Sequence, residues 1–267
     1  MRLPAIVALE GIDASGKATQ AKMLADYLDA RPCACGAPAH YVEHVDAGNP
    51  SSKLRCESCG MVGPGPCLRR SFPAYETDLG GLIRAALRGG WAADWAPGYP
   101  APPAARMDST GLRALVLQSL MVTNRHELAD EIEYEHMVKS RSIVLDRYWA
   151  SAVAYGAADG LDPKWLEGVH SRLPKAHHVL VDIPVEESFR RRPTREDAYE
   201  ADRGRLERAR AAYLALFERK GVDVGMLHGN SPGHVSPSGW AIVNGSGPPE
   251  LVHRAILMVL GIGGAVP

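Results

Sequence analysis

A glycine-rich segment near the N-terminus constrains this chain more than any other feature of its sequence. Residues 11–17 read GIDASGK, follow the apolar run 4–10, and precede a stretch in which Ala21, Leu24 and Leu28 share one helical face. The backbone N–H groups of such a strand-to-helix turn surround a phosphate, and the helix N-terminus adds positive potential. The segment therefore predicts a loop that binds a nucleoside triphosphate. The alternative is a tight turn with an incidental lysine.

The predicted loop departs from the usual pattern directly after its lysine. The residues expected to contact the triphosphate are Gly11, Ala14, Ser15, Gly16, Lys17, Ala18 and Thr19. Many loops of this type have a hydroxyl after the lysine as a magnesium ligand, but Ala18 stands there. We predict that Asp146 binds Mg²⁺ instead, because it ends an apolar strand and the carboxyl ends of parallel strands meet at one sheet edge. A strand-end aspartate can equally cap a helix.

Apolar runs of strand length alternate with helical periods along the chain, as in a parallel sheet covered by helices. The predicted strands are residues 4–10, 68–72, 142–146, 178–183 and 240–244. One long helix is predicted over residues 110–138, and residues 225–239 are predicted to be a plain surface loop. Residues 31–67 interrupt the pattern and are predicted to be an insertion. We expect an α/β fold with three layers and a five-stranded parallel sheet.

Composition and charge exclude several classes of protein. Of the 267 residues, 46% are hydrophobic and 23% are charged, and the 30 basic side chains nearly cancel the 31 acidic ones. No global field therefore attracts nucleic acid or anionic lipid. The longest apolar run, residues 255–266, is shorter than the roughly 18 residues that suggest a membrane span. Clustered cysteines fit a reducing compartment, so we expect a cytoplasmic protein with no membrane or nucleic-acid partner.

Five blocks of the sequence resemble, in the same order, those of the thymidylate kinase family. They are residues 9–20 (LEGIDASGKATQ), 71–75 (SFPAY), 124–127 (NRHE), 146–155 (DRYWASAVAY) and 197–200 (DAYE). The resemblance implies a P-loop nucleoside monophosphate kinase domain over residues 1–267 and a homodimer. It also implies magnesium-dependent transfer of the γ-phosphoryl group of ATP to deoxythymidine monophosphate (dTMP).

The resemblance gives each matched side chain a role. Lys17 would steady the β and γ phosphates, Arg147 would hold the phosphate of the acceptor, and Asp13 would reach its sugar 3′-hydroxyl. Arg125 would bind the thymine edge, although alone it could be a solvated charge in an ion pair. The implied monophosphate-binding residues are Asp13, Phe72, Tyr75, Met121, Arg125, Arg147, Ser151, Tyr155 and Tyr199. The implied catalytic residues are Lys17, Asp146, Arg147, Arg191 and Arg195.

Residues 188–200 match the mobile lid of the family. A catalytic arginine comes in this family from the phosphate loop or from the lid. Because the loop here offers Ala14 and Ser15, the lid is expected to supply it through Arg191 or Arg195. Without the resemblance, these arginines would be the solvated basic face of a surface helix.

Three departures from the family bear on the base that is bound. Met121 stands where a phenylalanine usually stacks on thymine, Ala152 stands where some relatives have a polar side chain, and Ala74 replaces an arginine. A different or modified deoxynucleoside monophosphate is therefore an alternative acceptor. Further alternatives are a kinase of the unphosphorylated deoxynucleoside, a zinc-ribbon ATPase that binds nucleic acid, and a nucleotide-binding protein without catalysis.

The insertion carries two cysteine pairs about 20 residues apart. Cys33, Cys35, Cys56 and Cys59 have the spacing of a zinc ribbon, and a small loop-rich segment needs such a cross-link to stay folded. We predict a structural Zn²⁺ held by these four thiolates, with free thiols as the alternative. One pair has the less usual Cys-x-Cys form, so His40, His44 or Cys67 could replace one ligand. Otherwise Cys67 is expected to be a buried thiol.

Overall fold

The computed structural model describes residues 6–29, 41–43, 54–56, 58, 62–63, 67–87, 112–139, 141–193, 202–228 and 233–262. Several predicted site residues lie outside these ranges: Cys33, Cys35, Cys59, Arg195 and Tyr199. The alternative zinc ligands His40 and His44 also lie outside them, and Cys56 is described only as part of a strand. The zinc site and the outer part of the lid therefore stay predictions.

The described residues form a central sheet in the order β5-β6-β1-β7-β9-β8. Its strands are β5 (Leu68–Ser71), β6 (Ile143–Asp146), β1 (Ile6–Glu10), β7 (His177–Asp182), β9 (Ala241–Asn244) and β8 (Gly233–Val235). The first five are parallel to one another. They confirm the five predicted strands and the α/β fold class, and β8 adds a sixth strand at the edge.

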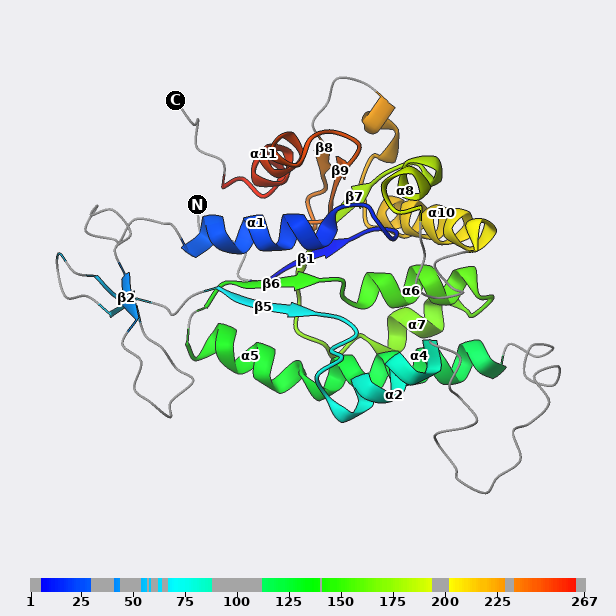
Figure 1. The fold of residues 1–267 in the computed structure, drawn as a ribbon, viewed down its shortest axis with the longest axis horizontal. Coiled ribbons are helices and arrows are strands. Elements are labelled where there is room, and N and C mark those ends of the chain that lie inside the picture. Colours follow the sequence, from blue (N-terminus) through cyan, green and yellow to red (C-terminus); the bar gives the residue numbers. More distant parts are fainter. Residues whose placement is uncertain are drawn as a thin grey trace.

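Helices cover both faces of the sheet (Figure 1). On one face lie α1 (Lys17–Asp29) and α11 (Pro249–Val259), which pack on Val7 and Leu9 of β1. The alternate residues of that strand, Ile6 and Ala8, face the opposite hydrophobic layer, as the twofold period of a strand requires. The helices of that second side include α5 (Ala129–Met137), α6 (Trp149–Ala158) and α10 (Arg203–Arg219). The three-layer arrangement is thus confirmed.

The remaining helices lie on the same side as α6 or near the carboxyl ends of the strands. They are α2 (Asp78–Leu87), α4 (Leu112–Glu127), α7 (Pro163–Val169), α8 (Val185–Arg191) and the short 3₁₀ helix η1 (Val224–His228). The predicted helix over residues 110–138 is wrong as one element, because α4 and α5 are separated at Leu128 (φ −103°, ψ 3°). The break follows Arg125 and His126, whose side chains bond the carbonyls of Met121 and Val122 one turn back. Such competition with the backbone ladder bends helices.

The predicted plain loop over residues 225–239 is also wrong in part. It contains η1 and the edge strand β8, which pairs antiparallel with β9. The sequence gives little sign of β8, because the strand is short and begins with a glycine, a residue that is uncommon in strands. A Cβ at Gly233 would lie 2.4 Å from the carbonyl oxygen of Ile242, so the close approach of the two backbones excludes a larger residue.

A second, small sheet lies within the predicted insertion. Its strands β2 (Tyr41–Glu43), β3 (Leu54–Cys56) and β4 (Val62–Gly63) are antiparallel in the order β2-β3-β4. Cys67, which follows, is half-buried against the core under α1, and its backbone N–H donates to Asp29 Oδ1 at 2.5 Å. Burial raises the pKa of the Cys67 thiol to about 12, with the charge of Asp29 acting in the same direction.

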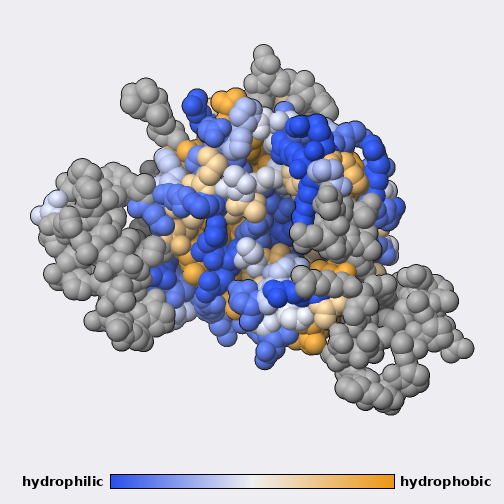
Figure 2. Space-filling model, in the orientation of Figure 1, coloured by the Kyte–Doolittle hydropathy of each residue, from blue (hydrophilic) through white to orange (hydrophobic). Residues whose placement is uncertain are grey.

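The surface and the helices bear on membrane association. Within the described ranges, none of the helices has both the length and the apolar character that crossing a membrane requires. On the described part of the face seen in Figure 2, hydrophobic residues occur in small separate areas between hydrophilic ones.

Candidate functional site

The glycine-rich loop joins β1 to α1 at the carboxyl end of the sheet. Gly11 has φ +147° and Gly16 has φ +93°, and Ala14 between them also has a positive φ of 60°. A Cβ at Gly11 would lie 2.6 Å from the carbonyl oxygen of Val181 on β7. Glycine is therefore required at position 11 both by its dihedral angle and by the neighbouring strand. α1 begins at Lys17, as in loops that hold a phosphate at a helix N-terminus.

Lys17 is buried under the loop and donates from Nζ to the carbonyl oxygen of Ile12 at 3.0 Å. Burial lowers the pKa of Lys17 to about 8, and the charge of Arg147 adds to this. The carboxylates of Asp13, Asp146 and Glu10 oppose the shift. A partly desolvated ammonium group at the mouth of an N–H cradle gains most when an anion binds beside it.

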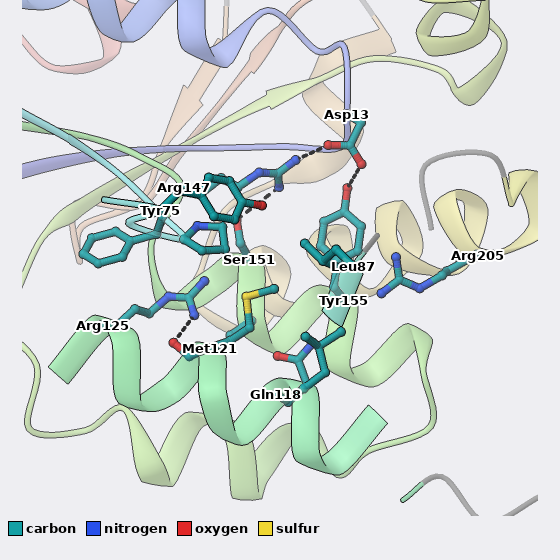
Figure 3. Close-up of a pocket in the computed structure, with 14 residues that line it drawn as sticks. Asp13, Tyr75, Leu87, Gln118, Met121, Arg125, Arg147, Ser151, Tyr155 and Arg205 are labelled. Carbon is teal, nitrogen blue, oxygen red and sulfur yellow. Dashed lines mark hydrogen bonds and ion pairs between the residues drawn. The ribbon is translucent and has the colours of Figure 1, made fainter. Parts of the chain in front are cut away.

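A cavity of about 130 Å³ opens on one side of the loop (Figure 3). It brings together most of the residues predicted to bind the monophosphate: Asp13, Phe72, Tyr75, Met121, Arg125, Arg147, Ser151 and Tyr155. They come from the glycine-rich loop, the β5–α2 connection, α4, and α6 with the turn before it. Ala152, one of the departures from the family, also lines this cavity, which we call the acceptor pocket.

Arg147 and Asp13 form an ion pair at the mouth of the acceptor pocket. Tyr155 donates its hydroxyl to Asp13 Oδ2 at 2.7 Å, and the guanidinium of Arg147 lies over the Tyr155 ring at 5.2 Å. Burial alone would raise the pKa of Asp13, but the charges of Arg147 and Lys17 and the Tyr155 hydrogen bond outweigh it and lower the pKa to about 2. The same ion pair raises the pKa of Arg147 against the effect of burial. Both groups are therefore charged at neutral pH.

Backbone geometry fixes the direction of Arg147. It has φ +66°, a strained value for a residue with a side chain, and its N–H donates to the carbonyl oxygen of Leu9 at 2.8 Å. Nη1 also donates to the carbonyl oxygen of Gly11 at 3.1 Å. Strain of this kind persists where the surroundings over-determine it, so the fold holds this guanidinium at the mouth of the pocket.

Arg125 lies at the inner end of the acceptor pocket with only 2% of its surface exposed. Its Nη1 donates to the carbonyl oxygen of Met121 at 2.7 Å, and its guanidinium lies 5.7 Å from the centre of the Phe72 ring. Burial lowers the pKa of Arg125 to about 10, although the charge of Glu10 opposes this. A third arginine at the pocket, Arg205, binds Asp159 through two hydrogen bonds of 2.6 and 2.8 Å. The pocket is thus lined by positive charge.

A buried network behind this pocket was missed by the sequence reasoning. Glu10, the fully buried last residue of β1, accepts hydrogen bonds from Tyr148 N–H at 3.1 Å and Ser151 Oγ at 2.5 Å. Its Oε1 also lies 3.2 Å from His178 Nδ1, and Ser151 Oγ lies 2.6 Å from the Tyr213 hydroxyl. The signal that could have found it is an acidic residue ending an otherwise apolar strand. The network fixes the turn that carries Arg147 onto the strand that leads to the glycine-rich loop.

A second cavity, of about 270 Å³, opens on the other side of the glycine-rich loop. Small residues of the loop and of the β9–α11 connection make up much of its lining. Arg191, near the C-terminal end of α8, closes over it: Nη1 donates to the carbonyl oxygen of Ser15 at 3.3 Å and Nη2 to that of Gly245 at 2.8 Å. Glu187 accepts from Nε of Arg191 at 2.7 Å and holds it there. We call this cavity the donor pocket.

Asp146 lies at the carboxyl end of β6, close enough to Lys17 to raise the pKa of that ammonium group. Its buried Oδ1 has no hydrogen-bond partner among the described residues. An orphaned carboxylate oxygen beside a phosphate loop suits a hard cation such as Mg²⁺. In the part of the chain that the structure describes, no group of three or more His, Cys, Asp or Glu side chains could hold a metal.

Sequence comparisons relate this chain to thymidylate kinases. No protein-family model matches the chain. The probable thymidylate kinase of Pyrococcus horikoshii is 28% identical over 215 residues, which cover 79% of this chain and 82% of that protein. The thymidylate kinase of Arabidopsis thaliana is 26% identical over 257 residues, or 96% of this chain and 70% of that protein.

These relatives support a place for the chain in the thymidylate kinase family. A shorter match, 40% identical over 83 residues, joins it to the probable thymidylate kinase of Sulfurisphaera tokodaii and covers 30% of this chain and 44% of that protein. The solved structure of the thymidylate kinase of Candida albicans has the same fold, with a TM-score of 0.60 and 19% identity over 97% of this chain and 92% of that one. The two pockets therefore lie on a fold that this family shares.

Proposed function

We propose that this member of the thymidylate kinase family transfers the γ-phosphoryl group of ATP to dTMP. The observation that carries the proposal is the pair of pockets on opposite sides of one glycine-rich loop, one of them lined by three arginines. Phosphoryl transfer between two nucleotides needs both held in line, with positive groups where charge develops on the transferred phosphoryl group. The homologous kinases support the same activity.

The donor pocket would hold ATP through the backbone of the loop. The N–H groups of residues 14–19 would surround the phosphates, with Lys17 beside the β and γ groups. Arg191 already bonds the carbonyl oxygens of Ser15 and Gly245, so a small rearrangement would bring its guanidinium onto the transferred group. Closure of residues 188–200 over the site would expel water, which otherwise competes as an acceptor. Arg195 and Tyr199 are proposed to complete this lid.

The acceptor pocket would hold the monophosphate with its phosphate toward Arg147 and its base toward Arg125. Asp13, charged at neutral pH, would release one Arg147 hydrogen bond and accept one from the sugar 3′-hydroxyl. Tyr155 would pack against the deoxyribose, while Phe72 and Met121 would cover the base. Ser151 and Tyr75 line the same pocket. Methionine covers a base by contact alone, so it selects less sharply than an aromatic ring.

Two metal ions are part of the proposal. Asp146, with its orphaned oxygen, would hold Mg²⁺ together with the phosphates, since Ala18 offers no hydroxyl. Magnesium, when bound, neutralises charge on the β and γ phosphates. Cys33, Cys35, Cys56 and Cys59 would hold a structural Zn²⁺ outside the active site.

The zinc ribbon is tested by removing one ligand. We expect Cys33→Ser to release zinc, measured by atomic absorption, and to lower the thermal unfolding midpoint, because a four-thiolate site loses its closed shell. Zinc content equal to that of the wild type would contradict the ribbon. We also propose a cytoplasmic homodimer, and sedimentation analysis measures the subunit number.

The activity is tested by incubating the protein with ATP, Mg²⁺ and each deoxynucleoside monophosphate in turn, with thymidine as the unphosphorylated control. The expected product is deoxythymidine diphosphate. A product from another monophosphate would change the base assignment. ATP hydrolysis that requires DNA and yields no nucleoside diphosphate beyond ADP would favour the alternative of a nucleic-acid-dependent ATPase.

A further inference from the structure

Gln118 is a polar residue in the acceptor pocket that the family resemblance does not point to. It lies on α4, in line with Met121 and Arg125, three and seven positions further along the same helical face. All three side chains line the pocket, and Figure 3 shows them rising from this helix toward the opposite wall that carries Arg147 and Asp13. Only 3% of the surface of Gln118 is exposed.

The amide oxygen of Gln118, Oε1, is buried without a hydrogen bond from any donor within the described ranges. A buried carbonyl without a donor costs free energy, because water satisfied it in the unfolded chain. A side chain kept in this state at the wall of a binding pocket indicates that the missing donor belongs to the ligand.

Packing explains how an amide on α4 reaches the place where a base would lie. On the facing helix α6, Ala152 and Gly156 are one turn apart and present no long side chain. A Cβ at Gly156 would lie 3.5 Å from Cδ of Gln118 and 2.5 Å from Cδ1 of Leu166, so a larger residue there would crowd the amide. Ala152 and Gly156 therefore leave the space that Gln118 fills, and the amide at this place comes from α4.

We infer that Gln118 is a specificity-determining residue that accepts a hydrogen bond from the N3–H of a 4-oxo pyrimidine base. This inference rests on the proposed function. The guanidinium of Arg125 can only donate, and it suits the O4 acceptor of thymine or uracil, while Oε1 of Gln118 suits the neighbouring N3–H donor. Cytosine presents the opposite order, an amino donor at position 4 and an acceptor at N3, so its amino group would face the cation. Gln118 and Arg125 together select the 4-oxo bases.

The experiment compares the wild type with Gln118→Met, which keeps the side-chain length and removes the amide, using dTMP and its 3-methyl analogue as acceptors. We expect Gln118→Met to raise the KM for dTMP about tenfold and to leave the KM for ATP unchanged. For the 3-methyl analogue, which has no N3–H, wild type and variant should have equal KM values. The matched control is Ser119→Ala on the exposed face of α4, whose hydroxyl bonds only the carbonyl oxygen of Leu115 among the described residues.

Three outcomes would overturn the inference. One is an unchanged KM for dTMP in Gln118→Met, and another is an equal loss for dTMP and for the 3-methyl analogue. The third is a loss that persists with the 3-methyl analogue but vanishes with 3′-deoxythymidine monophosphate, which would assign the amide to the sugar.

A second apolar variant, Gln118→Leu, guards against misfolding. Failure of both variants to fold, measured by circular dichroism, would make Gln118 a structural residue and would also overturn the inference. If the wild type phosphorylates no monophosphate, the proposed function fails. If it phosphorylates dTMP and Gln118→Met does so equally well, only the inference about Gln118 fails.

Discussion

The two pockets that flank the glycine-rich loop differ in the kind of residue that lines them. The donor pocket is lined largely by small residues such as Ala14, Gly245 and Gly247, whereas the acceptor pocket is lined mostly by larger side chains from several separate elements. Backbone groups recognise a phosphate whatever the side chains are. Side chains recognise one particular ligand, and substituting them weakens the binding of that ligand. We therefore expect substitutions at many positions of the acceptor pocket to raise the KM for dTMP. In the donor pocket, we expect substitutions at only a few positions to raise the KM for ATP.

Lys17→Ala is expected to have the largest effect, because Lys17 is a buried cation under the glycine-rich loop and is proposed to contact the outer phosphates of ATP. Turnover should fall at least about 10³-fold. The measurement is the rate of deoxythymidine diphosphate formation at saturating ATP and dTMP. Lys22→Ala, on the exposed face of the same helix, is the matched control and should keep wild-type activity. An active Lys17→Ala enzyme would remove the catalytic assignment of the loop.

Arg125→Met tests the acceptor side of the comparison. The substitution removes a buried cation from the inner end of the pocket, and the KM for dTMP should rise by about 10- to 100-fold while the KM for ATP stays constant. Arg219→Met, at the exposed end of α10, serves as the control. Equal changes in the two KM values would show that the pockets are not independent and would contradict the comparison.

The pH dependence sharpens the comparison, because each side of the loop holds a charged group whose pKa is lowered, and only one of the two loses its charge within the working range. Asp13, with its pKa lowered to about 2, stays charged throughout the working range. Lys17, with its pKa lowered to about 8, loses its charge above that pH. We expect kcat/KM for ATP to fall about tenfold per pH unit above 8. In the pH profile of kcat, the alkaline decrease should begin at a higher pH, because the phosphates of bound ATP favour the ammonium form of Lys17.

Lys17→Arg provides the control for this pH profile. Arginine keeps its charge at every pH of the assay, so the residual activity of the variant should lack the alkaline limb. A wild-type profile that is flat from pH 7 to 10 would contradict the assignment.

Ala18→Ser should have the smallest effect. Position 18 is exposed at the start of α1, directly after the buried lysine. An added hydroxyl should change turnover by no more than about twofold. The measurement is the Mg²⁺ dependence of the rate. A large gain in Mg²⁺ affinity would show that Asp146 does not hold the ion sufficiently in the wild type.

The sequence predicted the fold well because its signals are local. Apolar runs marked the five parallel strands, and the glycine-rich segment marked the strand-to-helix turn. The edge strand β8 was not predicted, because it depends on the close approach of Gly233 to the distant strand β9. The break at Leu128 was not predicted either, because it depends on side chains that bond helix carbonyls one turn back.

The candidate site was predictable only as far as the family motifs reach. Glu10 and Gln118 escaped because their importance lies in burial and in missing or multiple hydrogen-bond partners, which no pattern of residue types reveals. Arg205 escaped for a similar reason, since Asp159, its partner, is distant in sequence and the two meet only in the folded chain. Roles that rest on Arg195 and Tyr199 stay predictions.

One strand anchors both of the proposed nucleotide sites. The carbonyl of Leu9 and the carboxylate of Glu10 hold the turn that presents Arg147, and the very next residue, Gly11, begins the loop that is proposed to bind the triphosphate. A shift of β1 by a fraction of a residue would move donor and acceptor together and leave their mutual distance intact. The distance between the two proposed sites should therefore change little when other parts of the sheet are distorted.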